Sequence, residues 1–279
     1  MKKQLTILGC GSAVPTAKNC PSGQILEMCD KQFLIDCGEG VQNTMRQMML
    51  RTSRLYNIFI SHLHGDHCFG LLGLISTLGM MSRRQDLHIY AHKDLETLMR
   101  PLMAYHCPDL QFQVIFHAIN PRRHAVIYED RTVQVSTIPL RHSVPTCGFL
   151  FEEKPRRKHP DAHLFRYAYC SDTGYKPAIV PWIKGVDVLY HESTYLDEHK
   201  EAAQRYQHST ARQAAKIALK AEAGRLIIGH FSARVTDQSL FLKEASEVFD
   251  NVTLAEDRLV LDFEQEQDTN RIVNNESND

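Results

Sequence analysis

Short apolar runs bounded by glycine or polar turns recur along most of the chain. Runs of a few residues that are rich in Val, Ile, Leu and Phe are typical of β-strands. The pattern predicts strands over residues 5–8, 24–28, 32–35, 58–60, 87–90, 112–116, 125–128, 132–139, 148–152, 166–170, 186–190 and 226–229.

Longer segments that suit helices lie between these strands. The clearest is Ser209–Ala221, which is rich in alanine, has His208 or Ser209 near its start and is followed by Gly224, where a left-handed cap would fit. Neither a linker nor a repeat interrupts the alternation, so residues 1–263 are expected to form a single α/β domain of two packed sheets with helices outside. Further helices are predicted over residues 40–49, 71–81, 93–103 and 238–249.

Composition narrows the class of protein. The 279 residues are 43% hydrophobic, which is enough for a substantial core, and no apolar run reaches the roughly 18 residues of a membrane span. The eight cysteines include no CxxC pair and are expected to be reduced. These features predict a soluble, cytoplasmic protein with no membrane partner. The polar, aperiodic residues 264–279, with five acidic and one basic side chain, are expected to form a disordered acidic tail.

The net charge of −1 gives no overall attraction to nucleic acid. Any binding to a polyanion must therefore depend on local clusters, such as the basic string Lys154, Arg156, Arg157 and Lys158. Charge runs of this length are more often solvated faces, and both interpretations stay open here.

One segment concentrates groups that bind metals. Residues 61–67, SHLHGDH, follow the predicted strand 58–60 and place three imidazoles and a carboxylate on one strand-to-helix loop. A single loop histidine is usually a surface residue, whereas this density indicates a metal site. His62 and His64 alternate and can point at one ion, and Gly65 permits the turn that brings Asp66 and His67 towards a second.

This segment resembles the HxHxDH signature of the metallo-β-lactamase superfamily, and the resemblance extends across nearly the whole chain. It implies an α/β fold, the αβ/βα sandwich of two mixed sheets with outer helices, with a binuclear metal centre at one edge of the sheets. The ligand types favour zinc and leave manganese or iron open. The resemblance assigns His62, His64 and His142 to one ion, Asp66, His67 and His230 to the other, and Asp172 to the bridge between them.

Further strings are similar to those of ribonuclease Z, the endoribonuclease family that removes the 3′ trailer from precursor tRNA. The strings are ILGCGS at 7–12, DCGEG at 36–40, GLLGL at 70–74, HEST at 191–194, HST at 208–210 and FSAR at 231–234.

The resemblance to ribonuclease Z implies a phosphodiesterase in which Asp66 accepts a proton from the nucleophile while Glu192 and His208 act near the leaving group. An ordinary buried hydrogen-bonded pair is the alternative for Glu192 and His208. Ser232 and Arg234 become candidates for substrate contacts. Members of the family are commonly homodimers, so a homodimer is expected.

The chain also departs from this family. Its short members carry a long glycine- and proline-rich arm that grips tRNA before the strand of the bridging aspartate, but here only residues 152–165 lie there and none is glycine. The basic string 154–158 occupies the place of the arm. The first alternative to a precursor tRNA substrate is therefore a small phosphodiester such as a cyclic nucleotide, or another ester. The second is a binding module that has lost the chemistry.

Overall fold

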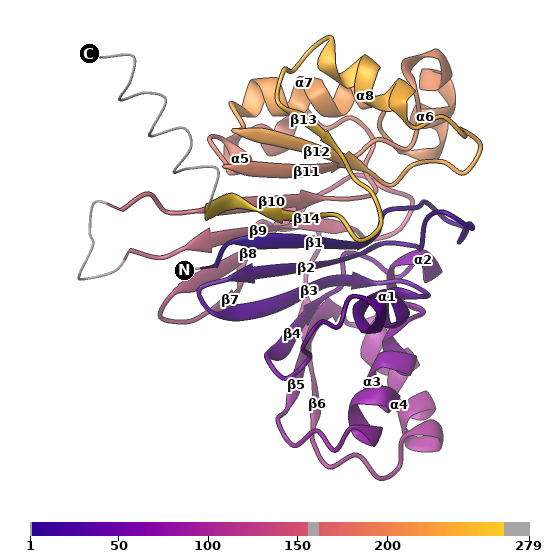
Figure 1. The fold of residues 1–279 in the computed structure, drawn as a ribbon, viewed down its shortest axis with the longest axis vertical. Coiled ribbons are helices and arrows are strands. Elements are labelled where there is room, and N and C mark those ends of the chain that lie inside the picture. Colours follow the sequence, from indigo (N-terminus) through magenta and orange to yellow (C-terminus); the bar gives the residue numbers. More distant parts are fainter. Residues whose placement is uncertain (1, 156–161, 265–279) are drawn as a thin grey trace.

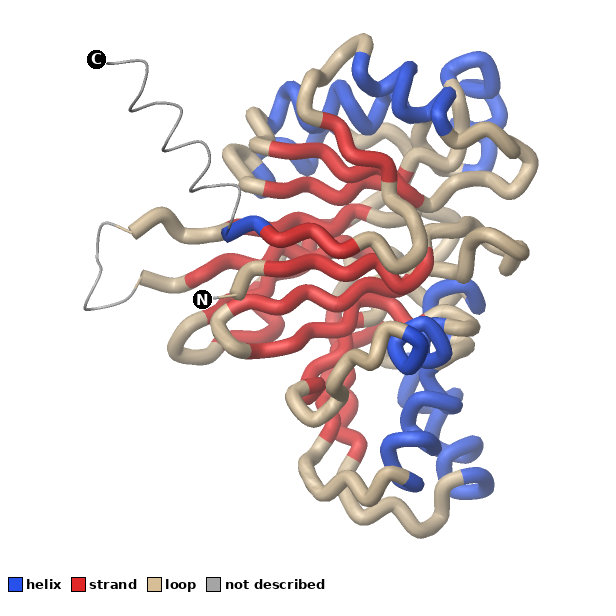
Figure 2. Tube along the Cα trace, viewed as in Figure 1, coloured by secondary structure: helices blue, strands red, loops and turns tan. Residues whose placement is uncertain are grey.

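A computed structural model describes residues 2–155 and 162–264 of the chain. Within these ranges the strands form two seven-stranded sheets that pack face to face, with helices on the outer faces (Figures 1 and 2). The strand orders are β14-β1-β2-β3-β4-β5-β6 and β13-β12-β11-β10-β9-β8-β7. Both sheets are mixed, since β3 to β6 and β10 to β13 run parallel while the remaining pairs are antiparallel. The predicted sandwich is confirmed.

The first sheet contains β1 (Gln4–Gly9), β2 (Gly23–Met28), β3 (Lys31–Cys37), β4 (Leu55–Phe59), β5 (Leu87–His92), β6 (Val114–Ile119) and β14 (Val260–Asp262). The second contains β7 (Val126–Glu129), β8 (Val133–Pro139), β9 (Cys147–Glu153), β10 (Arg166–Cys170), β11 (Val188–Glu192), β12 (Arg225–Gly229) and β13 (Val252–Leu254). The helices are α1 (Val41–Gln47), α2 (Gly65–Cys68), α3 (Leu71–Met80), α4 (Asp94–His106), α5 (Val180–Ile183), α6 (Lys200–Tyr206), α7 (Ala211–Ala221) and α8 (Ser239–Ser246), and short 3-10 turns cover Pro177–Ile179 and Asp197–His199.

The apolar side chains fill three layers. Aromatic residues dominate the layer between the sheets, where Phe59 packs on Phe149 and Phe151 across the sandwich. A second layer lies under α7 and α8, and a third lies under α1, α3 and α4. Each sheet is therefore covered on both faces, which explains why many strands read as continuous apolar runs.

The twelve predicted strands and five predicted helices all occur, with boundaries shifted by a few residues. The short strands β13 and β14 were not predicted, because three-residue strands carry no periodic signal and depend on a pairing partner. The expected cap of α7 is wrong. Thr210 caps its start in a reciprocal pair with Gln213, and Glu222, with φ 53°, supplies the left-handed end. Gly224 instead allows close packing, since a Cβ there would lie 2.7 Å from the carbonyl oxygen of Asp187.

Within residues 2–155 and 162–264, no helix is long and apolar enough to cross a membrane. The expected cytoplasmic location stays a prediction. Arg156, Arg157 and Lys158 of the basic string, and all of the predicted acidic tail except Glu264, lie outside the described residues. The eight cysteines are free, as expected.

Candidate metal centre

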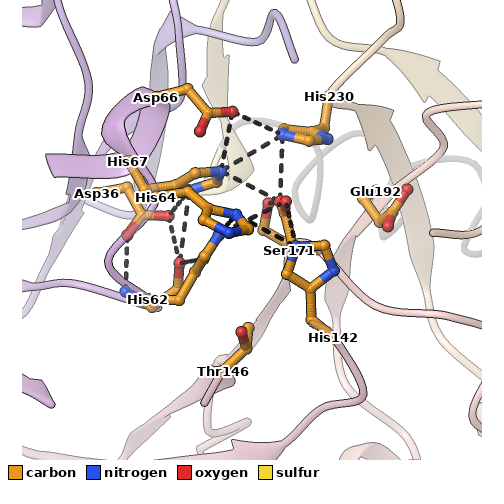
Figure 3. Close-up of polar contacts among 12 residues, drawn as sticks. Asp36, His62, His64, Asp66, His67, His142, Thr146, Ser171, Glu192 and His230 are labelled. Atoms are coloured by element: carbon orange, nitrogen blue, oxygen red, sulfur yellow. Dashed lines mark hydrogen bonds and ion pairs between the residues drawn. The ribbon is translucent and has the colours of Figure 1, made fainter. Parts of the chain in front are cut away.

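The seven predicted ligands come from loops that follow strands at one edge of the sandwich. The segment 62–67 follows β4 and runs into α2, while His142 lies beyond the end of β8. Asp172 and His230 lie beyond the ends of β10 and β12. Because the ends of strands meet at the sheet edge, residues far apart in the sequence converge there, as Figure 3 shows for the labelled histidines and Asp66.

Four donor atoms form a first set. The Nδ1 atom of His64 lies 3.1 Å from Nε2 of His62 and 3.3 Å from Nε2 of His142. The Oδ2 atom of Asp172 lies 3.5 Å from Nε2 of His62 and 3.6 Å from Nε2 of His142. These four atoms surround one position.

A second set uses the other oxygen of the same aspartate. Oδ1 of Asp172 lies 3.1 Å from Nε2 of His67 and 3.1 Å from Nε2 of His230, and those two nitrogens are 3.4 Å apart. Oδ2 of Asp66 lies 3.5 Å from each of these nitrogens. A tetrahedral zinc site with bonds of about 2.0–2.1 Å separates its ligands by about 3.3–3.5 Å. The four atoms of the first set and the three donors Asp66, His67 and His230 each suit a metal ion at these separations, and Asp172 has one oxygen facing each group.

The hydrogen bonds of the ring nitrogens that face away from these sets fix the tautomers. Nδ1 of His62 lies 3.0 Å from Oγ of Ser61, Nδ1 of His142 lies 3.2 Å from the carbonyl oxygen of Gln207, and Nδ1 of His230 lies 2.9 Å from Oγ1 of Thr194. The hydroxyls of Ser61 and Thr194 donate to carboxylates and therefore accept from the rings. The proton on Nδ1 leaves the lone pair of Nε2 free for a metal.

Asp36 is a site residue that the sequence reasoning missed. It is fully buried and accepts from Nδ1 of His67 at 2.8 Å, from the backbone N–H of Ser61 at 2.7 Å and from the hydroxyl of Tyr169 at 2.7 Å. It thus orients a ligand and fixes the loop that carries the motif. The available signal was an aspartate directly after the apolar run 32–35, at the start of the string DCGEG.

Three residues of the centre have unusual backbone conformations. Asp36, Asp172 and His230 have φ values of 57°, 34° and 60°, in the left-handed region that non-glycine residues seldom adopt. Such conformations cluster at functional sites, where the surrounding contacts hold them. Gly65 does not share this feature, so no left-handed backbone requires a glycine there; a Cβ at Gly65 would lie 2.4 Å from the ring of the exposed Phe69, which would have to shift.

The charges of the centre favour a cation. Burial lowers the pKa of His62 well below its ordinary value, which favours the neutral ring that ligation needs. For His67, burial also lowers the pKa, but the carboxylates of Asp172 and Asp36 outweigh it and raise the pKa well above its ordinary value. Burial raises the pKa of Asp172, yet His230 and His67 hold it well below its ordinary value. The buried carboxylates therefore attract positive charge, which a metal ion supplies.

Glu192 and His208 form a pair beside the centre. Oε1 of Glu192 accepts from Nδ1 of His208 at 2.8 Å and from the backbone of Thr173 at 2.8 Å, while Oε2 accepts from the hydroxyl of Thr194 at 2.7 Å. Burial alone would raise the pKa of Glu192, but the charge and hydrogen bond of His208 outweigh burial and lower this pKa to about 2. Burial lowers the pKa of His208, and Glu192 raises it to about 9. The pair is a carboxylate and an imidazolium whose ring lies 5.6 Å from that of His230, between centroids.

A cavity of about 580 Å³ opens over the centre and is lined by Asp66, His142, Asp172, His208 and His230 among others. Ser232 lines a neighbouring cavity of about 220 Å³, which shares Ser12 with the first. Arg234 lines neither and lies near Tyr195.

Lys154 lies directly beyond β9, at the end away from the metal centre, where Nζ contacts Glu129 at 2.6 Å. Seven residues of β9 separate it from the edge with the metal centre, roughly 23 Å at the rise of a strand. The structure therefore brings Glu192 and His208 to the centre with the seven ligands, but not Ser232, Arg234 or Lys154. Their substrate contacts stay predictions.

The sequence and the fold were compared with those of known proteins. A family profile described as the Beta-lactamase superfamily domain matches residues 31–231. Ribonuclease Z of Bacteroides thetaiotaomicron is 44% identical over 96% of this chain and 98% of its own length, and ribonuclease Z of Porphyromonas gingivalis strain W83 is 43% identical over 92% and 98%. The crystal structure of the short form of human tRNase Z superposes with a TM-score of 0.78 at 28% identity, covering 92% of this chain and 98% of that one.

The sandwich and the histidine and aspartate cluster at its edge define a metal-dependent hydrolase of the metallo-β-lactamase type. Within that superfamily, the chain belongs to the ribonuclease Z family. One difference stands out. The alignment with the B. thetaiotaomicron relative runs over 308 positions, whereas 96% of this chain is about 268 residues, so about 40 positions of the relative have no counterpart here.

Proposed function

We propose that this chain is an endoribonuclease that removes the 3′ trailer from precursor tRNA, using two metal ions held by the seven predicted ligands. The supporting observation is the four-donor set of His62, His64, His142 and Asp172 beside the three-donor set of Asp66, His67 and His230, with Asp172 between the two sets and His208 next to them. His62, His64 and His142 would hold one ion, and Asp66, His67 and His230 the other. Zinc is the proposed metal because imidazole and carboxylate ligands at these separations suit it.

When bound, the two ions supply Lewis acidity to the phosphodiester and lower the pKa of an attacking water. The chain's own groups manage the protons. Asp66 lines the cavity, and its Oδ2, which also faces His67 and His230, accepts from the backbone N–H of Ala13 at 2.8 Å; this fixed carboxylate is the group proposed to accept the proton from the nucleophile. His208, held by Glu192 through Nδ1, presents its other nitrogen for donation to the leaving oxygen.

A small phosphodiester, such as a cyclic nucleotide, is the second candidate substrate. Two observations favour it: the chain lacks about 40 residues that its relative carries, and a cavity of about 580 Å³ is of the size that holds a small ligand. A binding module without chemistry is disfavoured, because all seven predicted ligands gather in the donor groups.

A substrate panel with zinc-reconstituted protein tests the proposal. We expect cleavage of a precursor tRNA at the 3′ end of the mature sequence, at a rate well above that for cyclic nucleotides. Cyclic nucleotide hydrolysis without cleavage of precursor tRNA would favour the second candidate. Elemental analysis should give two zinc ions per chain, and a protein with far less than two after reconstitution would support the inactive module.

The expected homodimer is also a proposal. Its support is a set of exposed apolar side chains on and next to the neighbouring helices α3 and α4, namely Met80, Met81, Leu98, Leu102 and Tyr105. Large exposed apolar surface often marks association sites. Light scattering after gel filtration should give twice the mass of one chain, and a mass of one chain would refute the dimer.

A further inference from the structure

Two exposed aromatic rings stand at the mouth of the metal cavity. Phe69 is 75% exposed and Tyr206 is 51% exposed, and both line the cavity of about 580 Å³. Phe69 directly follows α2, from the part of the chain with the first sheet, and Tyr206 ends α6, from the part with the second (Figure 1). The two rings therefore reach the cavity from different halves of the molecule.

The ring of Phe69 lies close to Gly65. A Cβ at Gly65 would meet three atoms of the Phe69 ring at 2.4, 2.6 and 2.7 Å, so the ring lies against the loop that carries the metal ligands. Gly65 has no positive φ that would otherwise explain a glycine. The missing side chain thus makes room for an aromatic ring on the rim of the cavity rather than in the core.

Tyr206 lies on the side of the Glu192–His208 pair. It precedes His208 by two residues, and the guanidinium of Arg205 lies 5.5 Å from its ring centroid. The carbonyl of Gln207, between them, binds the ring of His142 at 3.2 Å. Tyr206 therefore lines the same cavity as His208, the group proposed to serve the leaving oxygen.

The cavity offers an RNA strand few other contacts. Among the described residues that line it, none is lysine or arginine, and Glu39 and Asp66 are acidic. Apart from the imidazolium of His208 and the proposed metal ions, phosphate contacts with cationic groups are therefore absent from the described part of this lining. Aromatic faces bind unstacked bases of any sequence, and recognition of single-stranded RNA commonly uses them.

We propose that Phe69 and Tyr206 form a clamp that stacks on the two nucleobases flanking the scissile phosphate. Tyr206 takes the base of the nucleotide whose oxygen leaves, and Phe69 takes the base of the nucleotide that keeps the phosphate. The clamp rests on the proposed RNA substrate. It assigns binding across the cleavage site to aromatic stacking.

The test compares Phe69→Leu and Tyr206→Leu on a precursor tRNA that is intact or lacks one of the two flanking bases. On intact RNA each variant should lose about 5- to 150-fold in kcat/KM, mainly through KM, the range for stacking on one base. On RNA that lacks the base contacted by the removed ring, each variant should match the wild type. On RNA that lacks the other flanking base, the variant should still be slower than the wild type. Tyr56→Leu, at the start of β4 and 40% exposed, is the control and should match the wild type.

A second readout needs no cleavage. The RNA carries the fluorescent base 2-aminopurine in place of one flanking base. Binding of this RNA to the zinc-loaded wild type should quench the 2-aminopurine fluorescence before turnover. The variant that lacks the ring proposed to contact that base should show no quench. Equal losses on intact and on abasic RNA would overturn the clamp while leaving the RNA substrate in place. A wild type that hydrolyses bis(p-nitrophenyl) phosphate but cleaves no RNA would overturn the proposed function and the clamp together.

Discussion

Asp172 is the residue on which both donor sets depend, because each of its oxygens faces two imidazole nitrogens. Asp172→Ala should abolish hydrolysis and reduce the metal content of both sites. His64→Ala should reduce the content of the first. Loss of a group that only orients a ligand costs up to about 100-fold in metal affinity. Because these two variants remove a ligand itself, we expect their losses to exceed that value. Elemental analysis and the rate on bis(p-nitrophenyl) phosphate measure both effects.

His106, the last residue of α4, provides the control for these variants. It lies on the surface in none of the donor groups found among the described residues. His106→Ala should leave metal content and rate nearly unchanged. Full metal occupancy together with a near-normal rate in Asp172→Ala or His64→Ala would refute the ligand assignment.

His208 should matter most when the leaving group needs a proton. Removing it should slow cleavage that releases a ribose hydroxyl by about 10²- to 10⁴-fold, the usual range for general acid–base catalysis. Release of p-nitrophenolate needs no proton, so His208→Ala should cost much less on that substrate. Single-turnover rates on the two substrates give the contrast, and equal losses on both would remove His208 from the acid role.

At the scale of an element, the end of β3 supports the metal centre through Asp36. The carboxylate of Asp36 accepts from His67, Ser61 and Tyr169. Asp36→Asn puts an amide in a place where every partner is a donor. Metal affinity should fall about 10- to 100-fold, as for other partners that orient a metal ligand. Competition with a chelator of known zinc affinity measures this.

The matched control for Asp36→Asn lies at the other end of the same hairpin. Asp30 sits in the turn between β2 and β3 with φ 61°, a conformation that asparagine tolerates well. Asp30→Asn should keep wild-type zinc affinity. If Asp36→Asn binds zinc as tightly as Asp30→Asn does, Asp36 has no part in orienting the ligand.

The elements show where sequence reasoning succeeds and where it stops. The strands with continuous apolar runs and the alanine-rich helix α7 were predicted because burial leaves a local pattern in the sequence. Asp36 and Tyr169 escaped prediction because they meet only when β3 and β10 face each other across the two sheets. The helix α7 ends at Ala221 as predicted, but its left-handed cap was assigned to Gly224, because Glu222 takes the conformation for which glycine is the usual choice.

At the scale of the whole molecule, the metal ligands join the two halves of the sandwich. Segment 62–67 follows a strand of the first sheet, whereas His142, Asp172 and His230 follow strands of the second. Metal that binds only the folded chain stabilises it by about 2.7 kcal/mol when its free concentration is 100 times Kd. Chelation should therefore lower Tm by about 5–10 °C in the wild type. Asp172→Ala should show little change on chelation, and an unchanged Tm in the wild type would argue against ligands shared between the halves.

Lys154, the first residue of the basic string 154–158, lies at the opposite end of β9 from the metal centre, so an effect of the string on RNA should be separable from catalysis. Lys154 anchors one end of the string through Glu129 and the carbonyl of Asp130. Converting Arg156, Arg157 and Lys158 to glutamine should weaken binding of precursor tRNA and reduce the slope of log K against log salt by about 0.9 for each lost phosphate contact. Hydrolysis of bis(p-nitrophenyl) phosphate should be unchanged, because that substrate reaches only the metal cavity. Lys216→Gln with Lys220→Gln on α7 removes charge elsewhere and should leave the slope as it is. A slope that does not move when the string is neutralised would identify residues 154–158 as a solvated turn and leave RNA binding to other surfaces.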